Sequence, residues 1–159
     1  MKFKITPIGK VHIEENNYLI QLEKGYKTGL LHLDGFSHLY VIWWAHLTDT
    51  NDERSRTITK NIFREAPNEV GVFASRTPVR PNPVMISTVK VLEIDHQNGI
   101  IHIPFIDAEH DTPVIDIKPY FPVERQKTCS TPRYYSHWPK WAEDAEEFNW
   151  KEEIRLDGV

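Results

Sequence analysis

The most chemically suggestive stretch of this chain is residues 71–83, GVFASRTPVRPNP. Its three prolines fix their own φ angles and push the preceding residues toward extended conformations, so they predict a stiff, non-helical loop. Arg76 and Arg80 lie four residues apart, and no acid occurs between residues 71 and 90. A rigid backbone with unpaired guanidinium groups could hold a carboxylate, a phosphate or an aromatic face. The equally supported alternative is that the prolines shape a turn and the arginines pair with distant acids.

A second candidate is residues 113–122, PVIDIKPYFP, which we interpret as a β-strand. Alternate side chains of a strand share a face, so Asp116, Lys118 and Tyr120 would point the same way. An acid, an amine and a phenol in line could position a cofactor or move a proton. The pattern by itself favours a simpler interpretation, an exposed ion pair that contributes about 0–1 kcal/mol.

The eight histidines and the single cysteine form no familiar metal or nucleophile motif. His38 and His46 would share a strand face, but eight strand residues span about 26 Å, which is too far for one ion. No HExxH, HxxxH or paired-cysteine spacing occurs, so we expect no metal. His46 lies at the end of an apolar run and is better placed for a cofactor contact. Cys129 cannot form an internal disulfide, which favours a reducing compartment.

Short β-rich runs separated by turn residues must position these side chains. The Asp-Gly pair at residues 34–35 and the Asn-Gly pair at residues 98–99 are both typical of hairpin turns. Residues 36–47 are apolar on both faces and predict a central buried strand. The other expected strands are residues 2–8, 17–22, 29–33, 86–94, 100–106 and 113–120. Together they predict one β-barrel, and the lack of βαβ alternation or a GxGxxG motif argues against a doubly wound fold.

One helix is expected, over residues 138–150. Trp138, Trp141, Ala145 and Phe148 recur there at helical spacing, with acids on the other side. We expect this helix to close one end of the barrel or sandwich, with its aromatic residues in the core. The predicted organisation is a β-barrel domain over residues 1–137, with a C-terminal helix and acidic tail, residues 138–159, packed on it.

Composition sets the broad class. The chain has 159 residues, of which 40% are hydrophobic, and this fits one globular domain. No apolar run approaches about 20 residues and no signal peptide is evident, so we expect a cytoplasmic protein that does not enter a membrane. The net charge is −4, but residues 141–159 alone carry −5, which leaves the rest slightly basic. This distribution permits RNA binding without indicating it.

Three blocks of the chain resemble the TsaA-like family, which includes the TrmO tRNA methyltransferases. The blocks are GFSHLYVIWWAH at residues 35–46, GVFASRTPVRPNPVMIS at residues 71–87 and DTPVIDIKPYFP at residues 111–122. The resemblance implies an all-β fold, a single β-barrel of the class VIII methyltransferase type, that binds S-adenosyl-L-methionine and forms a homodimer. It also implies methylation of N6 of threonylcarbamoyladenosine at position 37 of tRNA.

The resemblance also implies roles for individual residues. Asp116 is the candidate catalytic base for the N6 proton, and Lys118 would tune it by proximity. The implied substrate contacts are Arg80, Asn82 and Tyr120. The implied cofactor contacts are His46, Leu47, Arg76, Ile86, His110, Asp111, Thr112 and Pro113.

The chain departs from the family pattern at several places. Residues 9–21 lack the Pro-Arg-Gln stretch that often touches the cofactor, and we expect no extension domain after the barrel. Met85 replaces a glycine, and His110-Asp111 replaces Asp-Gly, so that turn must differ in backbone or carry strain. Two alternatives stay open: a methyltransferase of the same fold that acts on a small molecule, and a non-catalytic module that binds S-adenosyl-L-methionine or a nucleotide.

Overall fold

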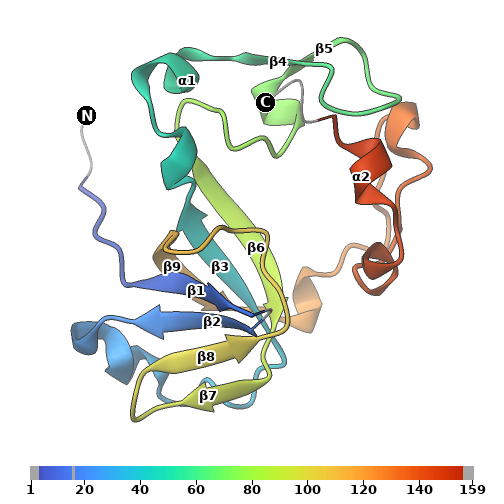
Figure 1. The fold of residues 1–159 in the computed structure, drawn as a ribbon. Helices are drawn as coiled ribbons and strands as arrows, with labels where there is room; N and C mark the ends of the chain where they lie inside the picture. The colour runs from blue at the N-terminus through green and yellow to red at the C-terminus, as the bar shows by residue number, and fades with distance from the viewer. Residues whose placement is uncertain (1–3, 16, 156–159) are drawn as a thin grey trace. The chain divides into compact units, whose positions relative to one another are not determined.

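A computed structural model describes residues 4–15 and 17–155, which divide into two compact units (Figure 1). The first unit is Met1–Asp49 together with Pro83–Glu124, and the second is Thr50–Asn82 together with Arg125–Val159. The chain therefore leaves the first unit, returns to it and leaves it again. The domain boundary expected after residue 137 stays a prediction.

The first unit is built on a seven-stranded antiparallel sheet with the order β6-β3-β9-β1-β2-β8-β7. Its strands are β1 Gly9–Glu14, β2 Asn17–Leu22, β3 His38–Trp44, β6 Val84–Lys90, β7 Glu93–Asp95, β8 Ile100–Ile103 and β9 Pro113–Pro119. Short 3-10 helices lie at Lys24–Leu30, His46–Thr48 and Pro122–Glu124. The prediction of a mostly β fold without βαβ units is confirmed.

The two predicted hairpin turns have different outcomes. At residues 98–99 the turn is confirmed, because β7 pairs with β8 and Gly99 has a φ of 74°, which a side chain would disfavour. At residues 34–35 the prediction is wrong. Residues 29–33 form no strand, and β3 pairs with β6 and β9 instead. The 3-10 helix Lys24–Leu30 packs its last residue in the core, so the apolar run there reflects a buried turn.

The strand expected from residues 36–47 is β3, an interior strand between β6 and β9 that has only one face fully buried. Leu39, Val41 and Trp43 point into the apolar core, whereas the alternate residues of the strand are half-buried. The core residues that neighbouring strands supply include Val11, Ile20, Val89, Ile101, Ile103 and Val114. The period-two alternation of β3 therefore separates a core face from an outer face.

The edge strands of this sheet, β6 and β7, form no ladder with each other in the described residues. They are consecutive in the chain and are joined only by Val91 and Leu92. The Val91 N–H donates to the Ser37 carbonyl, and the Leu92 N–H donates to the His102 carbonyl, each at 2.9 Å. The β-rich fold is confirmed, but a single closed barrel is not.

The second unit contains little regular structure. Its elements are α1 Asn51–Ser55, β4 Ile58–Lys60, β5 Glu69–Gly71, α2 Trp150–Glu153 and 3-10 turns at Val72–Ala74, Arg133–Tyr135 and Glu143–Glu146. β4 and β5 form a separate antiparallel pair. Thr50 caps α1, because its hydroxyl accepts a hydrogen bond from the Glu53 N–H at 3.2 Å.

The helix predicted over residues 138–150 is wrong. α2 begins only at Trp150, and a short 3-10 turn, Glu143–Glu146, precedes it. The ring centroids of Trp138 and Trp150 lie 5.1 Å apart, whereas a continuous α-helix would separate the two residues by about 18 Å along its axis. Trp138 also contacts the Phe63 ring at 5.0 Å. These aromatic residues meet because the chain folds back on itself.

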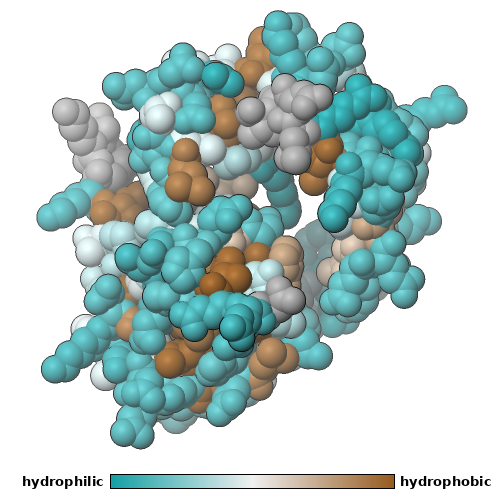
Figure 2. All heavy atoms as spheres, viewed as in Figure 1, coloured by the Kyte–Doolittle hydropathy of each residue, from teal (hydrophilic) through white to brown (hydrophobic). Residues whose placement is uncertain are grey.

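No helix in the described parts of the chain is long and apolar enough to cross a bilayer. The face drawn in Figure 2 is mostly hydrophilic, with hydrophobic residues in separate small groups. Exposed large hydrophobic side chains include Leu47, Phe73, Val123 and Trp141. Scattered exposed apolar residues of this kind are ordinary on a globular surface.

Candidate functional site

Several predicted cofactor residues meet at one end of three adjacent strands. His46 and Leu47 follow β3, and β6 begins beside them, since its first residue lies opposite the last residue of β3. β9 begins at the same end, with Pro113 directly after Thr112. Ile86, the third residue of β6, lies close to this end. The fold of the first unit therefore brings together residues that are far apart in the sequence.

His46 carries an unsatisfied polar atom at this strand end. Its Nδ1 atom is buried and has no hydrogen-bond partner among the described residues. Buried side-chain nitrogens nearly always have a partner, so this atom is suited to a hydrogen bond with a bound molecule. Leu47 is 67% exposed and Ile86 is 45% exposed, and both offer apolar surface. This combination fits a cofactor with polar and apolar parts.

The outer face of the sheet lines up Ile86, Ile42 and Asp116 across β6, β3 and β9. Directly paired residues of antiparallel strands share a face. With strands about 4.8 Å apart, Ile86 and Asp116 are about 10 Å from each other. Ile42 was not among the site residues expected from the sequence. The alternation within residues 36–47 was the signal for it, because it places Ile42 on the face opposite the buried Val41.

Asp116 is held in place by two contacts. Lys118 Nζ lies 2.7 Å from Asp116 Oδ2, and the Ile117 N–H donates to Oδ1 at 2.9 Å. The exposed ion pair expected from the sequence is therefore present. A carboxylate oxygen has two acceptor positions, so each oxygen of Asp116 can still accept a proton or a further hydrogen bond.

Tyr120, a predicted substrate contact, lies at the opposite end of β9 from Pro113. The seven strand steps between the two residues span about 23 Å. The Tyr120 N–H donates to the His38 carbonyl at 3.0 Å, and its ring contacts the rings of His38 and Tyr40. Tyr120 therefore belongs to an aromatic group where β3 begins, and the structure does not bring it to the strand end that carries His46.

The turn before β9 has an unusual backbone, as the sequence predicted. Asp111 has a φ of 62°, in the left-handed region that residues with side chains rarely adopt. Its N–H donates to the Val11 carbonyl at 2.9 Å, and its carboxylate accepts from Lys10 Nζ at 3.2 Å. The hydrogen bond and the positive charge of Lys10 lower the pKa of Asp111. The neighbouring Thr112 is buried.

Residues 71–82 of the proline-rich loop lie in the second unit and bond largely to that unit's own residues, whereas Pro83 belongs to the first unit. Arg80 Nη2 donates to the Val72 carbonyl at 3.1 Å, and Asn82 Oδ1 accepts from Arg54 Nη2 at 3.4 Å. Arg76 is exposed and has no ion-pair partner among residues 4–15 and 17–155. The prolines shape the loop into a turn, and Arg80 bonds within it. Arg76 is the loop arginine that is available to bind a ligand.

Met85 points away from the outer face of β6. It lies opposite Trp43 and belongs to the apolar core of the first unit. Its chain neighbours Val84 and Ile86 are on the exposed side. Methionine adapts well to irregular core spaces, so the Met85 side chain can fill the core at this position. Its bulk therefore does not cover the outer face of β6, which carries Ile86.

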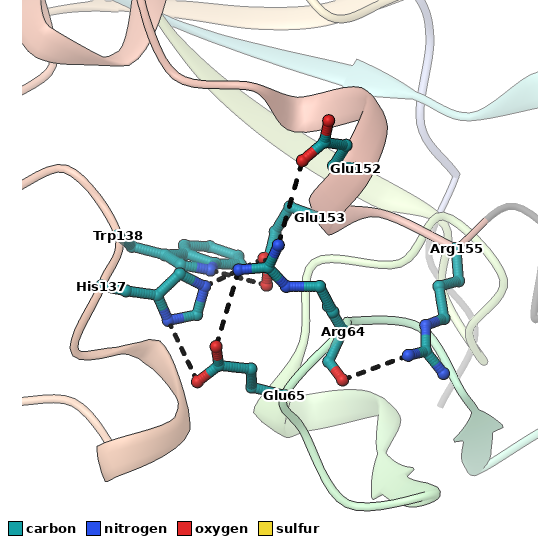
Figure 3. Close-up of polar contacts among 7 residues, drawn as sticks. All are labelled: Arg64, Glu65, His137, Trp138, Glu152, Glu153 and Arg155. Carbon is teal, nitrogen blue, oxygen red and sulfur yellow. Dashed lines mark hydrogen bonds and ion pairs between the residues drawn. The ribbon is translucent and has the colours of Figure 1, made fainter.

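A buried charged cluster in the second unit was not predicted from the sequence (Figure 3). Glu153 is only 2% exposed, and its carboxylate accepts hydrogen bonds from His137 Nε2 and Trp138 Nε1, each at 2.9 Å. Arg64 Nε lies 4.0 Å from the same carboxylate. Burial raises the pKa of Glu153, but the hydrogen bonds from His137 and Trp138 and the charge of Arg64 outweigh it, so the pKa is lowered.

The cluster also joins backbone segments that are far apart in the sequence. The Arg64 N–H donates to the Glu153 carbonyl, and the Arg155 N–H donates to the Ile62 carbonyl, each at 3.0 Å. His137 Nδ1 lies 3.7 Å from Glu65 on its other side. These contacts fix the C-terminal segment to residues 62–65. The sequence offered no clear signal for them, since Glu153 stands in an acid-rich segment that suggests a solvated surface.

The first unit is all-β, with an open antiparallel sheet and a strand end that is partly apolar and partly polar. It therefore belongs to a different fold class from the doubly wound nucleotide-binding proteins. The chain belongs to the tRNA-methyltransferase O N-terminal domain family, whose sequence profile matches residues 2–124. This match spans all seven strands of the first unit and the proline-rich loop of the second.

Curated relatives resemble the chain at moderate identity. A "Probable S-adenosyl-L-methionine-binding protein" from Methanocaldococcus jannaschii is 38% identical over 118 residues, which cover 73% of this chain and 90% of that protein. A protein of similar name from Pyrococcus horikoshii is 38% identical over 117 residues, covering 73% and 81%. The tRNA (adenine(37)-N6)-methyltransferase of Escherichia coli is 36% identical over 92 residues, covering 57% of this chain and 38% of that enzyme.

Crystal structures of TrmO have a similar fold. One superposes with a TM-score of 0.64 at 23% identity and covers 84% of this chain and 64% of that chain. TrmO from Pseudomonas aeruginosa superposes with a TM-score of 0.63 at 22% identity, covering 82% and 61%. At this identity the likeness concerns the fold alone. The chain spans less than two thirds of these TrmO chains and well under half of the Escherichia coli enzyme.

Proposed function

We propose that this chain binds S-adenosyl-L-methionine and transfers its methyl group to N6 of threonylcarbamoyladenosine at position 37 of tRNA. The observation that carries the proposal is the family match over residues 2–124, whose relatives are named for S-adenosyl-L-methionine binding and for methylation of adenine 37. The unsatisfied Nδ1 atom of His46 supports it, because His46 stands at a matching motif position.

S-adenosyl-L-methionine supplies a methyl group on a positively charged sulfur when it is bound. His46 would hold a polar part of it through Nδ1, and Leu47 and Ile86 would cover an apolar part. Arg76 and residues 110–113 are further proposed contacts at motif positions. These side chains would act by orientation, and alignment of donor and acceptor can lower a barrier by roughly 7–11 kcal/mol.

Asp116 is the proposed base. Methylation requires N6 to lose a proton, and the Asp116 carboxylate would accept it. Lys118 Nζ, 2.7 Å from Oδ2, is a positioning residue that holds this carboxylate. Because an exposed pair contributes only about 0–1 kcal/mol to stability, substitutions here test chemistry more than folding.

The segment at residues 125–140 supports a polyanionic substrate. It contains no acid and four exposed bases: Arg125, Lys127, Arg133 and Lys140. These four side chains have no acidic partner among the described residues. Trp141, which follows them, is 69% exposed. Unpaired cations followed in the chain by an exposed aromatic residue suit the phosphates and bases of RNA.

Titration calorimetry with S-adenosyl-L-methionine tests the binding part of this proposal. We expect one binding site on the unmodified chain and about tenfold weaker binding by His46→Ala, since one hydrogen bond is lost. His38→Ala, at the other end of β3, is the matched control and should bind normally. No binding by the unmodified chain at millimolar cofactor would overturn the proposal.

A methyl-transfer assay on tRNA that carries threonylcarbamoyladenosine tests the chemical part. Asp116→Asn should lower kcat by about 10²–10⁴-fold while cofactor binding stays unchanged. Full activity of this variant would remove Asp116 as the base. Cofactor binding without tRNA methylation would point to a small-molecule acceptor or to a non-catalytic module, and a screen of small acceptors would separate these two.

We also propose that the chain forms a homodimer. The outer side of β6 exposes Val84 and Ile86, which are 39% and 45% accessible. A second copy covering this apolar strip would remove it from water. Light scattering should therefore give twice the chain mass, and Val84→Lys should give the monomer mass. A monomeric unmodified chain would contradict the proposal.

We propose that the sheet of the first unit closes into a single barrel. Closure would require its two edge strands, β6 and β7, to pair on either side of the connection at Val91 and Leu92. An experimental structure that kept the edges apart would exclude it. We further propose a cytoplasmic location, because a tRNA substrate and a lone cysteine both suit that compartment.

A further inference from the structure

Three potential metal ligands meet beside the turn that precedes β9. His12 comes from β1, and His110 and Asp111 come from the turn. One nitrogen of each histidine and one carboxylate oxygen all lie within 4.8 Å of one another. The two imidazole rings pack edge to face with centroids 5.5 Å apart. All three residues belong to the first unit, so one compact body holds them.

We propose that His12, His110 and Asp111 form a binding site for a divalent transition metal of the zinc type. Two imidazoles and one carboxylate are ligands that Zn²⁺ prefers, at about 2.0–2.2 Å from the ion, and water can complete a tetrahedral shell. Ligands of one ion must lie within about 4.2 Å of each other at those bond lengths. His110 Nε2 and Asp111 Oδ2 already do, at 3.7 Å.

The surroundings of His110 prepare it to bind metal through Nε2. Its Nδ1 can accept from the Ile13 N–H or donate to the Ile13 carbonyl oxygen, each at 3.1 Å, depending on the tautomer. When Nδ1 donates to the carbonyl, Nε2 keeps a free lone pair directed toward the Asp111 side. A backbone carbonyl is one of the common partners that orient a metal-bound histidine in this way. Metal binding would therefore select this tautomer.

Asp111 is oriented by two contacts that leave one oxygen available. Its left-handed backbone is fixed by the hydrogen bond from its N–H to the Val11 carbonyl, at 2.9 Å. Lys10 Nζ lies 3.2 Å from Oδ1, and Oδ2 is the oxygen that faces His110. Lys10 thus has two opposed effects, since it orients the carboxylate while its positive charge repels a cation. Removing that charge should strengthen metal binding.

The sequence alone did not suggest this site, because His12 lies far from His110 in the chain. β1 pairs with β9 at Gly9–Val114 and Lys10–Pro113, and this pairing brings the turn beside β1. The proposed site therefore differs from the sequence-based expectation that the chain binds no metal. The site stands on this geometry and does not depend on methyl transfer, but it shares His110 and Asp111 with the proposed cofactor contacts.

Calorimetric titration of the full chain with ZnCl₂, together with Co²⁺ absorption, tests the site. We expect one ion per chain, and d–d bands of Co²⁺ without thiolate charge transfer. His12→Ala and His110→Ala should each weaken binding by about 10–100-fold, as loss of a contact at a metal centre commonly does. Lys10→Met should strengthen binding several-fold, an outcome that a merely structural cluster would not produce.

His96→Ala is the matched control, because His96 pairs with Asp34 elsewhere in the first unit and should bind Zn²⁺ normally. Cys129→Ser should also bind normally. Circular dichroism establishes that each variant is folded. Absence of one-to-one binding by the unmodified chain, or Zn²⁺ binding by His12→Ala and His110→Ala as tight as that of the unmodified chain, would overturn the proposal. Cofactor titration is a separate measurement, so failure here leaves the proposed methyl transfer untouched.

Discussion

The two units of this chain are stabilised in different ways. In the first unit, strands such as β3 alternate between a buried apolar face and an outer face, and ladders join seven strands. In the second unit the described residues contain only the short β4–β5 ladder, and Glu153 lies buried among aromatic and basic side chains (Figure 3). A periodic apolar pattern suffices for the first unit, whereas the second depends on particular contacts between distant residues.

This difference determines how each unit should respond to substitution. An apolar core loses stability in proportion to the volume that a truncation leaves empty. A buried charged cluster loses stability because the groups that remain are left without partners. The first unit should therefore tolerate polar changes outside its core, and the second should be sensitive at single polar residues.

The largest expected effect is from Leu39→Ala in β3. Leu39 is fully buried in β3, which pairs with β6 on one side and β9 on the other. Removing three carbons there should lower the free energy of unfolding by about 2–5 kcal/mol. Urea denaturation measures this change, and hydrogen exchange should show faster exchange across β3, β6 and β9. A loss below about 1 kcal/mol would contradict the central role of β3.

Glu153→Gln should destabilise the second unit by about 1–3 kcal/mol, because an amide cannot accept every hydrogen bond that His137 and Trp138 donate. Hydrogen exchange of the Arg64 and Arg155 amides would detect the change. Glu152→Gln is the control, since Glu152 is exposed and lies 4.0 Å from Arg64. Equal effects of the two substitutions would show that burial of Glu153 is unimportant.

The stability of the second unit should fall in acid because of Glu153. The pKa of Glu153 lies below its ordinary value of 4.5, so the folded chain binds a proton there less readily than the unfolded chain. The resulting stabilisation is fully present above pH 4.5 and is lost as the pH falls through the lowered pKa. Urea denaturation at several pH values should show a steeper acid loss for the unmodified chain than for Glu153→Gln.

Two glycine substitutions, one in each unit, should have smaller effects on stability and test the difference between the units. Gly99→Ala should cost the first unit about 1–2 kcal/mol, because Gly99 has a φ of 74° at the β7–β8 turn. Gly71→Ala in β5 has open space around the added carbon and an ordinary φ of −60°, so it should stabilise the second unit by about 0.4–1 kcal/mol. Thermal unfolding measures both, and opposite signs are expected.

Much of the first unit was predictable from local patterns. The strand near residues 36–47 and the turn at residues 98–99 follow from alternation and from the need for glycine at a positive φ. The Asp-Gly pair at residues 34–35 led to a wrong prediction of a hairpin, because the apolar run before it is buried by a 3-10 helix and forms no strand. Local turn chemistry does not reveal whether the flanking segment can pair.

The candidate site was only partly predictable. The motifs identified His46, Ile86 and Asp116, but their arrangement on β3, β6 and β9 depends on strand register. Ile42 joins them only through that register. The aromatic residues between residues 138 and 150 suggested a helix. The contact of Trp138 with Phe63 shows why periodicity fails when the partner lies elsewhere in the chain.

By itself the sequence determined that this is a β-rich protein with a stiff proline loop and an acid–amine pair on one strand face, because those properties depend on near neighbours. Only the tertiary structure decided which residues meet. It buried Glu153 between His137 and Trp138, turned Met85 into the core, and placed His12 beside His110 and Asp111. Contacts of this kind form only after the strands have paired and the chain has folded back, so no local spacing encodes them.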